Sequence, residues 1–415
     1  MTLNEIQDAQ KRISGHVLRT PLRVWDHLRR GLRHEAPIFL KLETLQTTGA
    51  FKVRGAANKI LKLIEEGKKP SRIVAASAGN HAQAVAFISG KLGIPSTIVM
   101  PAGSPLVKAA ATRDYGADVV LHGAIYDEAF AKAQEILAQT PGSVYVHAYE
   151  DADVIAGQGT MGIEIHEQLK EQGISSESPL QLVVPIGGGG LISGVATSVK
   201  SLRPATRVLG VVCEAAPGMA LSLDAGKVIQ PTTKRTRTLG EGLAVKKVSE
   251  MTFGLVKNLV DEIAVVTDDE MALAITTLME RGKLVAEGSG AAGVAAALAY
   301  KFKKLDPKIP TVFVLCGGNI DMNLMSNILE RGLSKDGRWL SIQVTVEDRP
   351  GNLAKVATLI AESGANVLEV AHDRTSPRCP LGHTRIRFQL ETRGLQHAGE
   401  IQRTIESQGI VVEAL

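Results

Sequence analysis

The stretch QLVVPIGGGGLISGVATSVKSL, residues 181–202, carries the pattern that decides the fold. The five residues that follow Gln181 are apolar and rich in branched side chains, which predicts a buried strand, and the segment after the glycines predicts a helix. Between them stand Gly187, Gly188, Gly189 and Gly190, which allow the backbone to approach an anion closely. The helix N-terminus adds the positive end of its dipole, so the turn suits a phosphate group. A tight strand-to-helix turn without a ligand is the alternative.

Strands and helices alternate on both sides of this turn. We expect further strands at 38–43, 72–77, 96–101, 117–122, 144–149, 207–214, 262–267 and 311–318. Helical patterns lie between most of them. Continuous valine- and isoleucine-rich strands separated by helices predict an α/β protein with a parallel sheet covered on both faces.

The order of the predicted strands and helices changes near residue 338. Strands are predicted at 339–348, 366–374, 383–392 and 410–415, and helices at 352–364 and 395–409. This βαββαβ order is the ferredoxin-like pattern. The polar stretch before it predicts a linker at 331–338, so we expect domains at 1–330 and 339–415.

The composition of the 415 residues is that of a globular protein, with 44% hydrophobic and 22% charged residues. The net charge is only +4 and aromatic residues make up 4%, which argues against a nucleic-acid partner. The three cysteines are scattered and show no paired spacing for zinc, so no metal site is expected. No apolar run is long enough for a membrane span, and we expect a soluble, cytoplasmic protein without a membrane partner.

A lysine with unusual neighbours occurs in the segment TGAFKVRG, residues 48–55. Lys52 has apolar neighbours and is flanked by glycines near the end of a predicted strand. Desolvation would lower the pKa of its amine, and a neutral amine attacks carbonyl groups. For a single lysine, an ordinary solvated surface charge is the alternative.

Two more segments follow predicted strands. Residues 77–81 place small side chains and free N–H groups at a helix N-terminus, which suits a carboxylate, although an ordinary Ser/Asn cap is the alternative. Cys316 ends the strand 311–318, where open α/β sheets bind ligands, and its S–H could donate to a ring nitrogen. A buried apolar cysteine is the alternative. The glycine turn also leaves a dinucleotide site open: Glu214 stands where a ribose-binding acid would, although Ser193 breaks the glycine fingerprint.

Taken together, six motifs resemble one family. TGAFKVRGA, SAGNHAQAVA, VIAGQGT, PIGGGGLISG, EGLAV and LCGGNID occur in this order across residues 47–321. The chain resembles the pyridoxal-phosphate-dependent serine/threonine dehydratases of the tryptophan-synthase-β fold type (fold type II). This resemblance implies a two-lobed, parallel-sheet catalytic domain over 1–330, with a smaller lobe at roughly 70–147 inserted in the larger. It also implies pyridoxal 5′-phosphate, not NAD, as the cofactor.

The resemblance implies a role for each cofactor-binding residue. Lys52 would bind the cofactor covalently and then act as the catalytic proton-transfer base. The turn Gly187–Gly190 and the N–H of Leu191 would hold the phosphate, and Asn80 would hydrogen-bond the 3′-oxygen. Cys316 would face the pyridine nitrogen, where other members carry serine, and Phe51 would pack near the ring.

The resemblance assigns the substrate to residues 77–81. Ser77 would be catalytic and would hold the substrate carboxylate, together with the segment formed by Ala78, Gly79, Asn80 and His81. From the residues themselves, His81 is more readily explained as structural or capping. Similar serine racemases carry a second serine in place of Ala78, so racemisation should be minor here.

The activity that the resemblance implies is a carbon–nitrogen lyase reaction. L-threonine would give 2-oxobutanoate and ammonia, and L-serine would give pyruvate as a secondary activity. Alternatives are a dehydratase for serine or 3-hydroxyaspartate, and a catalytically weak amino-acid sensor on the same fold. Similar serine racemases bind a divalent cation through a glutamate and an aspartate six residues further on; here Glu214 is present but Ala220 replaces the aspartate, so no strong Mg²⁺ or Ca²⁺ site is expected.

The C-terminal unit resembles an ACT domain, with Asp348, Gly351, Asn352 and Leu353 in its strand-to-helix signature. This resemblance implies an amino-acid effector, isoleucine or valine, bound by these residues. Gly351 allows close backbone approach, and the following helix N-terminus favours a carboxylate. A purely structural oligomerisation module is the alternative. The family implies a homotetramer.

Overall fold

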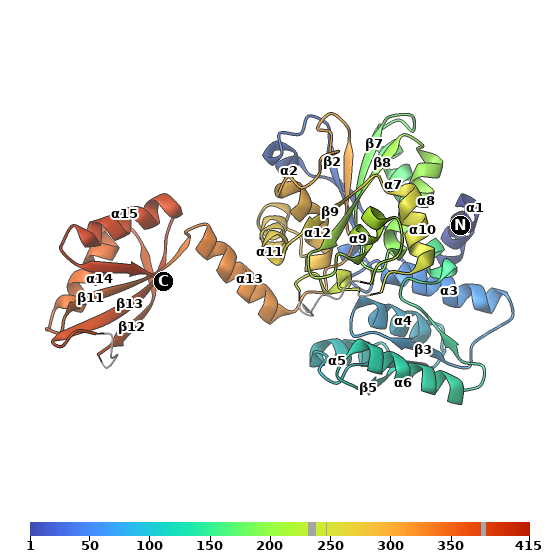
Figure 1. The fold of residues 1–415 in the computed structure, drawn as a ribbon, viewed down its shortest axis with the longest axis horizontal. Coiled ribbons are helices and arrows are strands. Elements are labelled where there is room, and N and C mark those ends of the chain that lie inside the picture. Colours follow the sequence, from blue (N-terminus) through green and yellow to red (C-terminus); the bar gives the residue numbers. More distant parts are fainter. Residues whose placement is uncertain (231–237, 246, 375–378) are drawn as a thin grey trace. The chain divides into compact units, whose positions relative to one another are not determined.

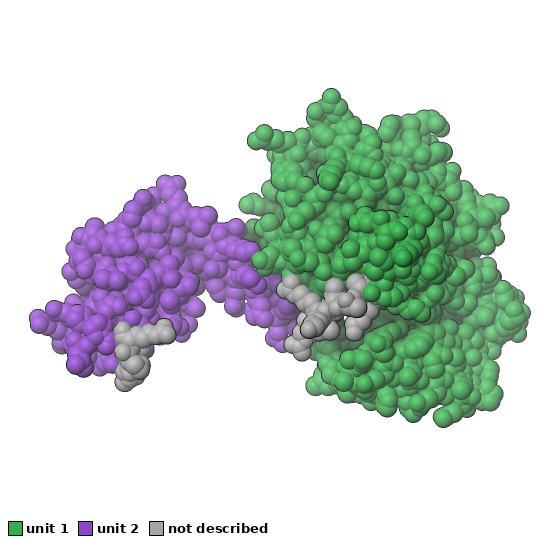
Figure 2. Space-filling view, in the orientation of Figure 1, with its two compact units in different colours: residues 1–320 green, residues 321–415 purple. Residues whose placement is uncertain are grey.

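The computed structural model describes residues 1–230, 238–245, 247–374 and 379–415. These residues form two compact units, 1–320 and 321–415 (Figure 2). Within these described ranges, no helix is both long and apolar enough to cross a membrane. Each unit has its own sheet and core, and each is described separately.

A six-stranded sheet forms the centre of the first unit (Figure 1). Its strands follow the order β1-β2-β10-β7-β8-β9 and comprise Leu22–Val24, Ile38–Leu42, Thr311–Leu315, Leu180–Pro185, Thr206–Cys213 and Glu262–Val266. All neighbours are parallel except β1, which pairs antiparallel with β2 and which the sequence pattern did not predict. The expected parallel α/β sheet is confirmed.

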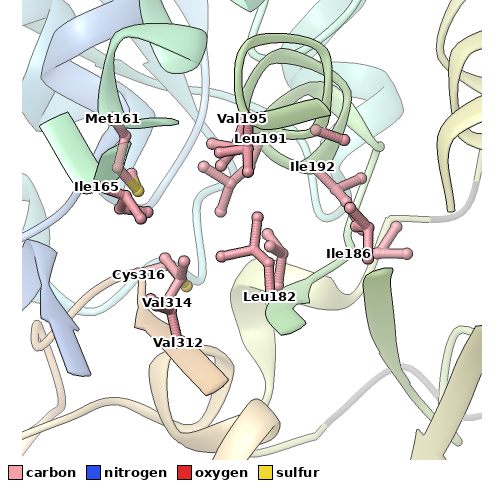
Figure 3. Packing of buried hydrophobic residues seen from close by; sticks show 14 of the residues in the cluster. Met161, Ile165, Leu182, Ile186, Leu191, Ile192, Val195, Val312, Val314 and Cys316 are labelled. Carbon is pink, nitrogen blue, oxygen red and sulfur yellow. The ribbon is translucent and has the colours of Figure 1, made fainter. Parts of the chain in front are cut away.

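Helices cover both faces of this sheet. Leu182 packs in one core cluster with residues of α7 (Ala152–Glu171) and α8 (Gly190–Leu202), as Figure 3 shows. On the other face, Val183 and Phe313 lie beneath α12 (Gly288–Leu298). The large sheet is also accompanied by the described helices α1 (Leu3–Ile13), α2 (Asp26–Gly31), α9 (Gly218–Ala225), α10 (Glu250–Leu259) and α11 (Asp268–Thr277). Three short helical turns are η1 (Glu43–Leu45), η2 (Glu241–Leu243) and the π-helical η3 (Leu278–Gly282).

A second, four-stranded parallel sheet lies within the same unit. Its order is β5-β4-β3-β6, with strands Asp118–Leu121, Ser96–Met100, Ile73–Ala76 and Val144–Tyr145. On one face pack α3 (Lys52–Glu65), α4 (Asn80–Lys91) and α5 (Leu106–Asp114), and on the other packs α6 (Tyr126–Gln139). These strands lie inside the segment expected to form the smaller lobe.

Two predicted strands are clearly shorter than expected: the strand at 311–318 ends as β10 at Leu315, so Cys316 follows it, and the strand at 144–149 is cut to two residues. The pattern at 144–149 predicts six residues of strand, but β6 ends at Tyr145. The reason is a turn that His147 stabilises: its Nδ1 accepts the N–H groups of Tyr149 at 3.3 Å and Glu150 at 2.8 Å. The chain therefore leaves the sheet and passes beside the glycine turn.

The second unit has the predicted βαββαβ order. Its antiparallel sheet follows β12-β13-β11-β14, with strands Asn366–Asp373, His383–Glu391, Trp339–Glu347 and Val411–Ala414. Helices α14 (Asn352–Glu362) and α15 (Leu395–Glu406) pack against it with Val356, Ile360, Ile401 and Ile405. The unit begins earlier than predicted, because α13 (Met322–Lys335) belongs to it and occupies most of the expected linker. An Asp321 cap begins this helix, and Met325 and Ile328 are its buried residues.

Candidate active site

Three chain segments meet where strands of the large sheet end. The glycine turn follows β7, residues 316–319 follow β10, and the segment that leads into α3 follows β2. The Phe51 N–H donates to the Cys316 carbonyl at 3.1 Å, and Ala50 forms an isolated antiparallel bridge with Gly317. The helix that carries Lys52 is thereby fixed to the end of the central strand β10.

Lys52 is the first residue of α3 and is largely enclosed. Its Nζ donates to the Ala148 carbonyl at 2.8 Å and lies 5.2 Å from the centre of the Phe51 ring. Burial lowers the pKa of this amine to about 8, although the neighbouring Cys316 and Glu287 act in the opposite direction. The alternative of a solvated surface charge does not hold, and a larger fraction of this amine is neutral near pH 7 than for an ordinary lysine.

The glycine turn is too crowded for other residues. A Cβ on Gly187 would lie 2.5 Å from the Gly242 carbonyl oxygen, and one on Gly188 would enter the Tyr149 ring. Gly189 has φ +89° and stands at the N-cap of α8, where L side chains are strained. The first N–H groups of α8 have no partner within the helix, so they are suited to an anion.

The segment 77–81 leads from β3 into α4. The Ser77 hydroxyl accepts the Gly79 N–H at 3.1 Å, and no side chain caps α4. Ala78 is half-buried, and a Cβ on Gly79 would meet open space. His81 is buried with its Nε2 2.8 Å from the Val146 carbonyl, and burial, reinforced by the charge of Lys52, lowers its pKa to about 3. His81 is therefore neutral and held in the interior.

A polar network connects Asn80 to Cys316. Asn80 Nδ2 donates to Glu287 Oε1 at 2.8 Å, and Ser289 Oγ donates to the same oxygen at 2.5 Å. The Cys316 Sγ donates to the Ser289 carbonyl at 3.4 Å. Burial raises the pKa of both Glu287 and Cys316, so Cys316 remains a neutral thiol. Asn80 Oδ1 in turn accepts from Asn319 Nδ2 at 2.9 Å.

The sequence pattern did not place Glu287 or Tyr149 at the site, although the structure brings both to it. Glu287 is the N-cap of α12, and an acid before the glycine-rich helix was the available signal. Tyr149 lies against Gly188, and its Oη donates to the Lys247 carbonyl at 3.1 Å. The only signal for Tyr149 was an aromatic residue beyond a predicted strand, which many structural residues share.

The residues of the predicted effector site lie at the start of α14 in the second unit. Gly351 has φ +97° at the N-cap of this helix. Asn352 Nδ2 donates to the Glu347 carbonyl at 2.8 Å, and Asp348 pairs with Arg374 at 3.2 Å. Leu353 is 40% exposed, so the turn offers both polar and apolar surface.

Comparison with known proteins places this site in a family. Residues 13–317 match the model of pyridoxal-phosphate dependent enzymes, and residues 339–413 match that of ACT domains. The chain belongs to the family of pyridoxal-phosphate dependent enzymes and carries a C-terminal ACT domain. This membership excludes the dinucleotide alternative for the glycine turn.

Individual proteins that resemble the chain have more specific names than the family does. The chain is 46% identical over 413 residues, 99% of each sequence, to the L-threonine ammonia-lyase of Thermotoga maritima. Among solved structures, the threonine deaminase of T.th. is 36% identical with a TM-score of 0.71 and matches 77% of this chain and 99% of its own. Maize serine racemase is 33% identical with a TM-score of 0.72 and matches 80% and 98%.

The residues present fit the cofactor of the family. A phosphate needs a cradle without side chains and with free N–H groups, which the crowded glycine turn and the start of α8 provide. Covalent binding of an aldehyde needs a neutral amine, which the lowered pKa of Lys52 favours. A pyridine ring needs polar partners at its edges, and Asn80 and the neutral Cys316 thiol are of that kind.

Proposed function

We propose that the protein converts L-threonine to 2-oxobutanoate and ammonia. The observation that carries this proposal is the 46% identity, over 99% of both sequences, to an L-threonine ammonia-lyase. Two features of the site support this reaction: the enclosed amine of Lys52, and the glycine turn, which has no side chains and is suited to an anion. Overall, the reaction removes the Cα proton and the β-hydroxyl group of the substrate, and hydrolysis then releases ammonia from the nitrogen-bearing product.

The cofactor would be held from several sides. Lys52 would bind it covalently, Phe51 would pack beside its ring, and Asn80 would donate to its 3′-oxygen. The N–H groups of Gly187–Gly190 and Leu191 would bind its phosphate, and Cys316 would face its ring nitrogen. When bound, pyridoxal phosphate delocalises the electron pair left at Cα, which makes the Cα proton acidic.

The substrate would be bound at the start of α4. Ser77 and the N–H groups that follow it would donate to the carboxylate, since these groups precede a helix N-terminus. Lys52 would then take the Cα proton, because a lysine whose pKa is about 8 is partly neutral at physiological pH. Ala78 has no proton to deliver to the opposite face of Cα, so racemisation would be minor.

The thiol of Cys316 would limit side reactions. Burial keeps it neutral, so it would not impose a proton on the ring nitrogen as a carboxylate would. A weaker electron sink favours elimination over transamination. A Cys316→Asp variant should therefore show a larger share of transamination per turnover, and an unchanged share would contradict this role.

The finer features of the function are proposals as well. L-serine would be converted to pyruvate as a secondary activity, and an amino acid, isoleucine or valine, would regulate the enzyme through the ACT domain. The exposed Leu353 beside the polar turn at Gly351 supports an effector with an apolar side chain. A cytoplasmic homotetramer and a place in isoleucine biosynthesis are proposed from the resemblance alone.

One absorbance experiment tests cofactor, reaction and substrate together. The purified protein should show a visible cofactor band that changes when L-threonine is added, and 2-oxobutanoate should accumulate. L-serine should react more slowly, and D-serine should not accumulate from L-serine at a comparable rate. If the cofactor band is present but only serine or 3-hydroxyaspartate is turned over, that amino acid, and not threonine, is the substrate.

A further inference from the structure

We propose that Glu287 is a positioning residue that fixes the amide of Asn80 and, through Ser289, the thiol of Cys316. One carboxyl group would thereby align the protein groups at both edges of the cofactor ring. The proposal rests on the roles assigned to Asn80 and Cys316 in the proposed function. It does not depend on which amino acid is the substrate.

The hydrogen bonds determine how the Asn80 amide is oriented. The Thr48 carbonyl can only accept, so Asn319 must present its Nδ2 to it, at 2.8 Å. The same Nδ2 donates to Asn80 Oδ1 at 2.9 Å, which identifies that atom as the oxygen. Asn80 Nδ2 must then face Glu287, to which it donates at 2.8 Å. The orientation follows from both ends of the chain of hydrogen bonds.

This arrangement leaves one N–H of Asn80 for a ligand. An asparagine side chain has two N–H groups and one carbonyl oxygen. Glu287 takes one N–H, and Asn319 occupies the oxygen. The second N–H is therefore directed away from both partners, and the amide acts as a donor toward an acceptor such as the 3′-oxygen.

The same carboxyl group reaches Cys316 through one residue. Glu287 accepts from the hydroxyl of Ser289, and the carbonyl of Ser289 accepts from the Cys316 thiol. The Glu287 backbone N–H also donates to the Gly317 carbonyl at 3.1 Å, next to Cys316. The fold keeps space for this network, because a Cβ on Gly317 would lie 2.6 Å from the Glu287 carboxylate oxygen.

The test measures cofactor affinity and spectrum in the full-length chain. The cofactor-free protein is titrated with pyridoxal phosphate, and the dissociation constant, the visible band and the melting temperature are recorded. Glu287→Ala removes the acceptor, Glu287→Gln keeps an acceptor oxygen, and Glu287→Asp withdraws it by one methylene. Glu262→Ala is the matched control, since Glu262 also accepts two hydrogen bonds, from the N–H groups of Lys303 and Lys304, but at the start of β9.

Glu287→Ala should weaken cofactor binding about tenfold, which corresponds to the loss of one buried hydrogen-bond partner, and should shift the visible band. Glu287→Gln and Glu262→Ala should remain close to the parent protein. Combining Glu287→Ala with Asn80→Ala should weaken binding by less than the product of the two single losses, because part of the effect of Glu287 is exerted through Asn80.

Three outcomes would overturn the proposal. They are an unchanged affinity and band in Glu287→Ala, equal losses in the Ala and Gln variants, and multiplicative losses in the double variant. If Glu287→Ala does not fold, the Glu287→Asp variant provides the test. Cofactor binding by Glu287→Asp that equals that of the parent protein would contradict the positioning role of Glu287. A parent protein that binds the cofactor but does not turn over threonine refutes only the proposed substrate.

Discussion

At the scale of single residues, the strongest prediction concerns Lys52. Lys52→Ala removes the amine that would bind the cofactor and move the Cα proton. We expect loss of the visible band and a fall in kcat/KM of more than about 10³-fold, since nucleophilic and proton-transfer roles are lost together. Lys62→Ala, on the same helix and paired with Asp153, should keep both. Substantial turnover by Lys52→Ala, with a normal melting temperature, would exclude the proposed mechanism.

The pKa of Lys52 predicts how fast the cofactor is captured at different pH values. Only the neutral amine reacts with an aldehyde, and burial lowers its pKa from 10.5 to about 8. Below pH 8 the rate of cofactor binding should rise about tenfold per pH unit, and above pH 8 it should level off. Stopped-flow mixing of cofactor-free protein with pyridoxal phosphate measures this. A rate that still rises about tenfold per unit well above pH 8 would mean that the lysine is an ordinary one.

The residue scale also shows what a sequence can predict about a site. Lys52 and the glycine turn stand in local patterns whose chemistry is evident from a few neighbouring residues. Glu287 has no such pattern, because its partner Asn80 is 207 positions away in the chain. Only the approach of α4 to the start of α12 makes the pair. Contacts of this kind depend on the packing of distant elements, which residue spacing does not reveal.

At the scale of elements, the turn between β7 and α8 combines backbone strain with a close approach. Gly189→Ala would put a Cβ 2.8 Å from Thr252 Cβ at a positive φ. We expect weaker cofactor binding by about tenfold or more, because a turn that shifts no longer directs its N–H groups at the phosphate. Gly254→Ala in α10 is the control, since its Cβ meets nothing within 4 Å. Equal cofactor affinity in both variants would disprove the cradle.

Helix α3 is held in place by a buried cluster of charges. Arg54 is fully buried and pairs with Glu43 at 2.9 Å and Glu164 at 2.6 Å, and Lys41 pairs with Glu164 at 2.5 Å. Removing Arg54 leaves two carboxylates without their main partner. We expect Arg54→Ala to lower the free energy of unfolding by about 3–5 kcal/mol, as for other broken buried pairs.

Urea unfolding measures this loss. Lys11→Ala, which removes the exposed pair with Asp8, should change the free energy of unfolding little. If Arg54→Ala is no less stable than Lys11→Ala, the cluster does not anchor the helix that carries Lys52.

Most elements could be predicted from the sequence because strands and helices have distinct periods. Two of the errors lie where tertiary contacts override the pattern. The strand at 144–149 is cut short by the turn at His147, and the polar segment before Trp339 is helical because Asp321 caps α13 and its apolar residues are buried. The antiparallel β1 has only three residues, too few for a periodic signal.

At the scale of the whole molecule, the catalytic unit and the ACT domain have separate cores. Among the described residues, the ACT domain packs its apolar side chains into a cluster of its own, and the clusters around the two parallel sheets draw on the catalytic unit. Regulation therefore requires that an effector binds two states of the whole protein with different affinity. If the turn before α14 binds the proposed effector, a substitution there should change regulation and leave the chemistry of the catalytic unit intact.

Asn352→Ala in the full-length chain tests this separation. It removes the hydrogen bond to the Glu347 carbonyl that fixes the turn before α14. We expect the concentration of isoleucine or valine that gives half of the maximal effect on threonine turnover to rise about tenfold, as for a lost hydrogen bond at a binding site. Turnover without effector and the cofactor band should match the parent. Asn366→Ala, an exposed residue at the start of β12, should respond to the effector as the parent does. If the parent responds to either amino acid and Asn352→Ala responds equally, the effector binds elsewhere; if the parent does not respond at all, the ACT domain has a structural role.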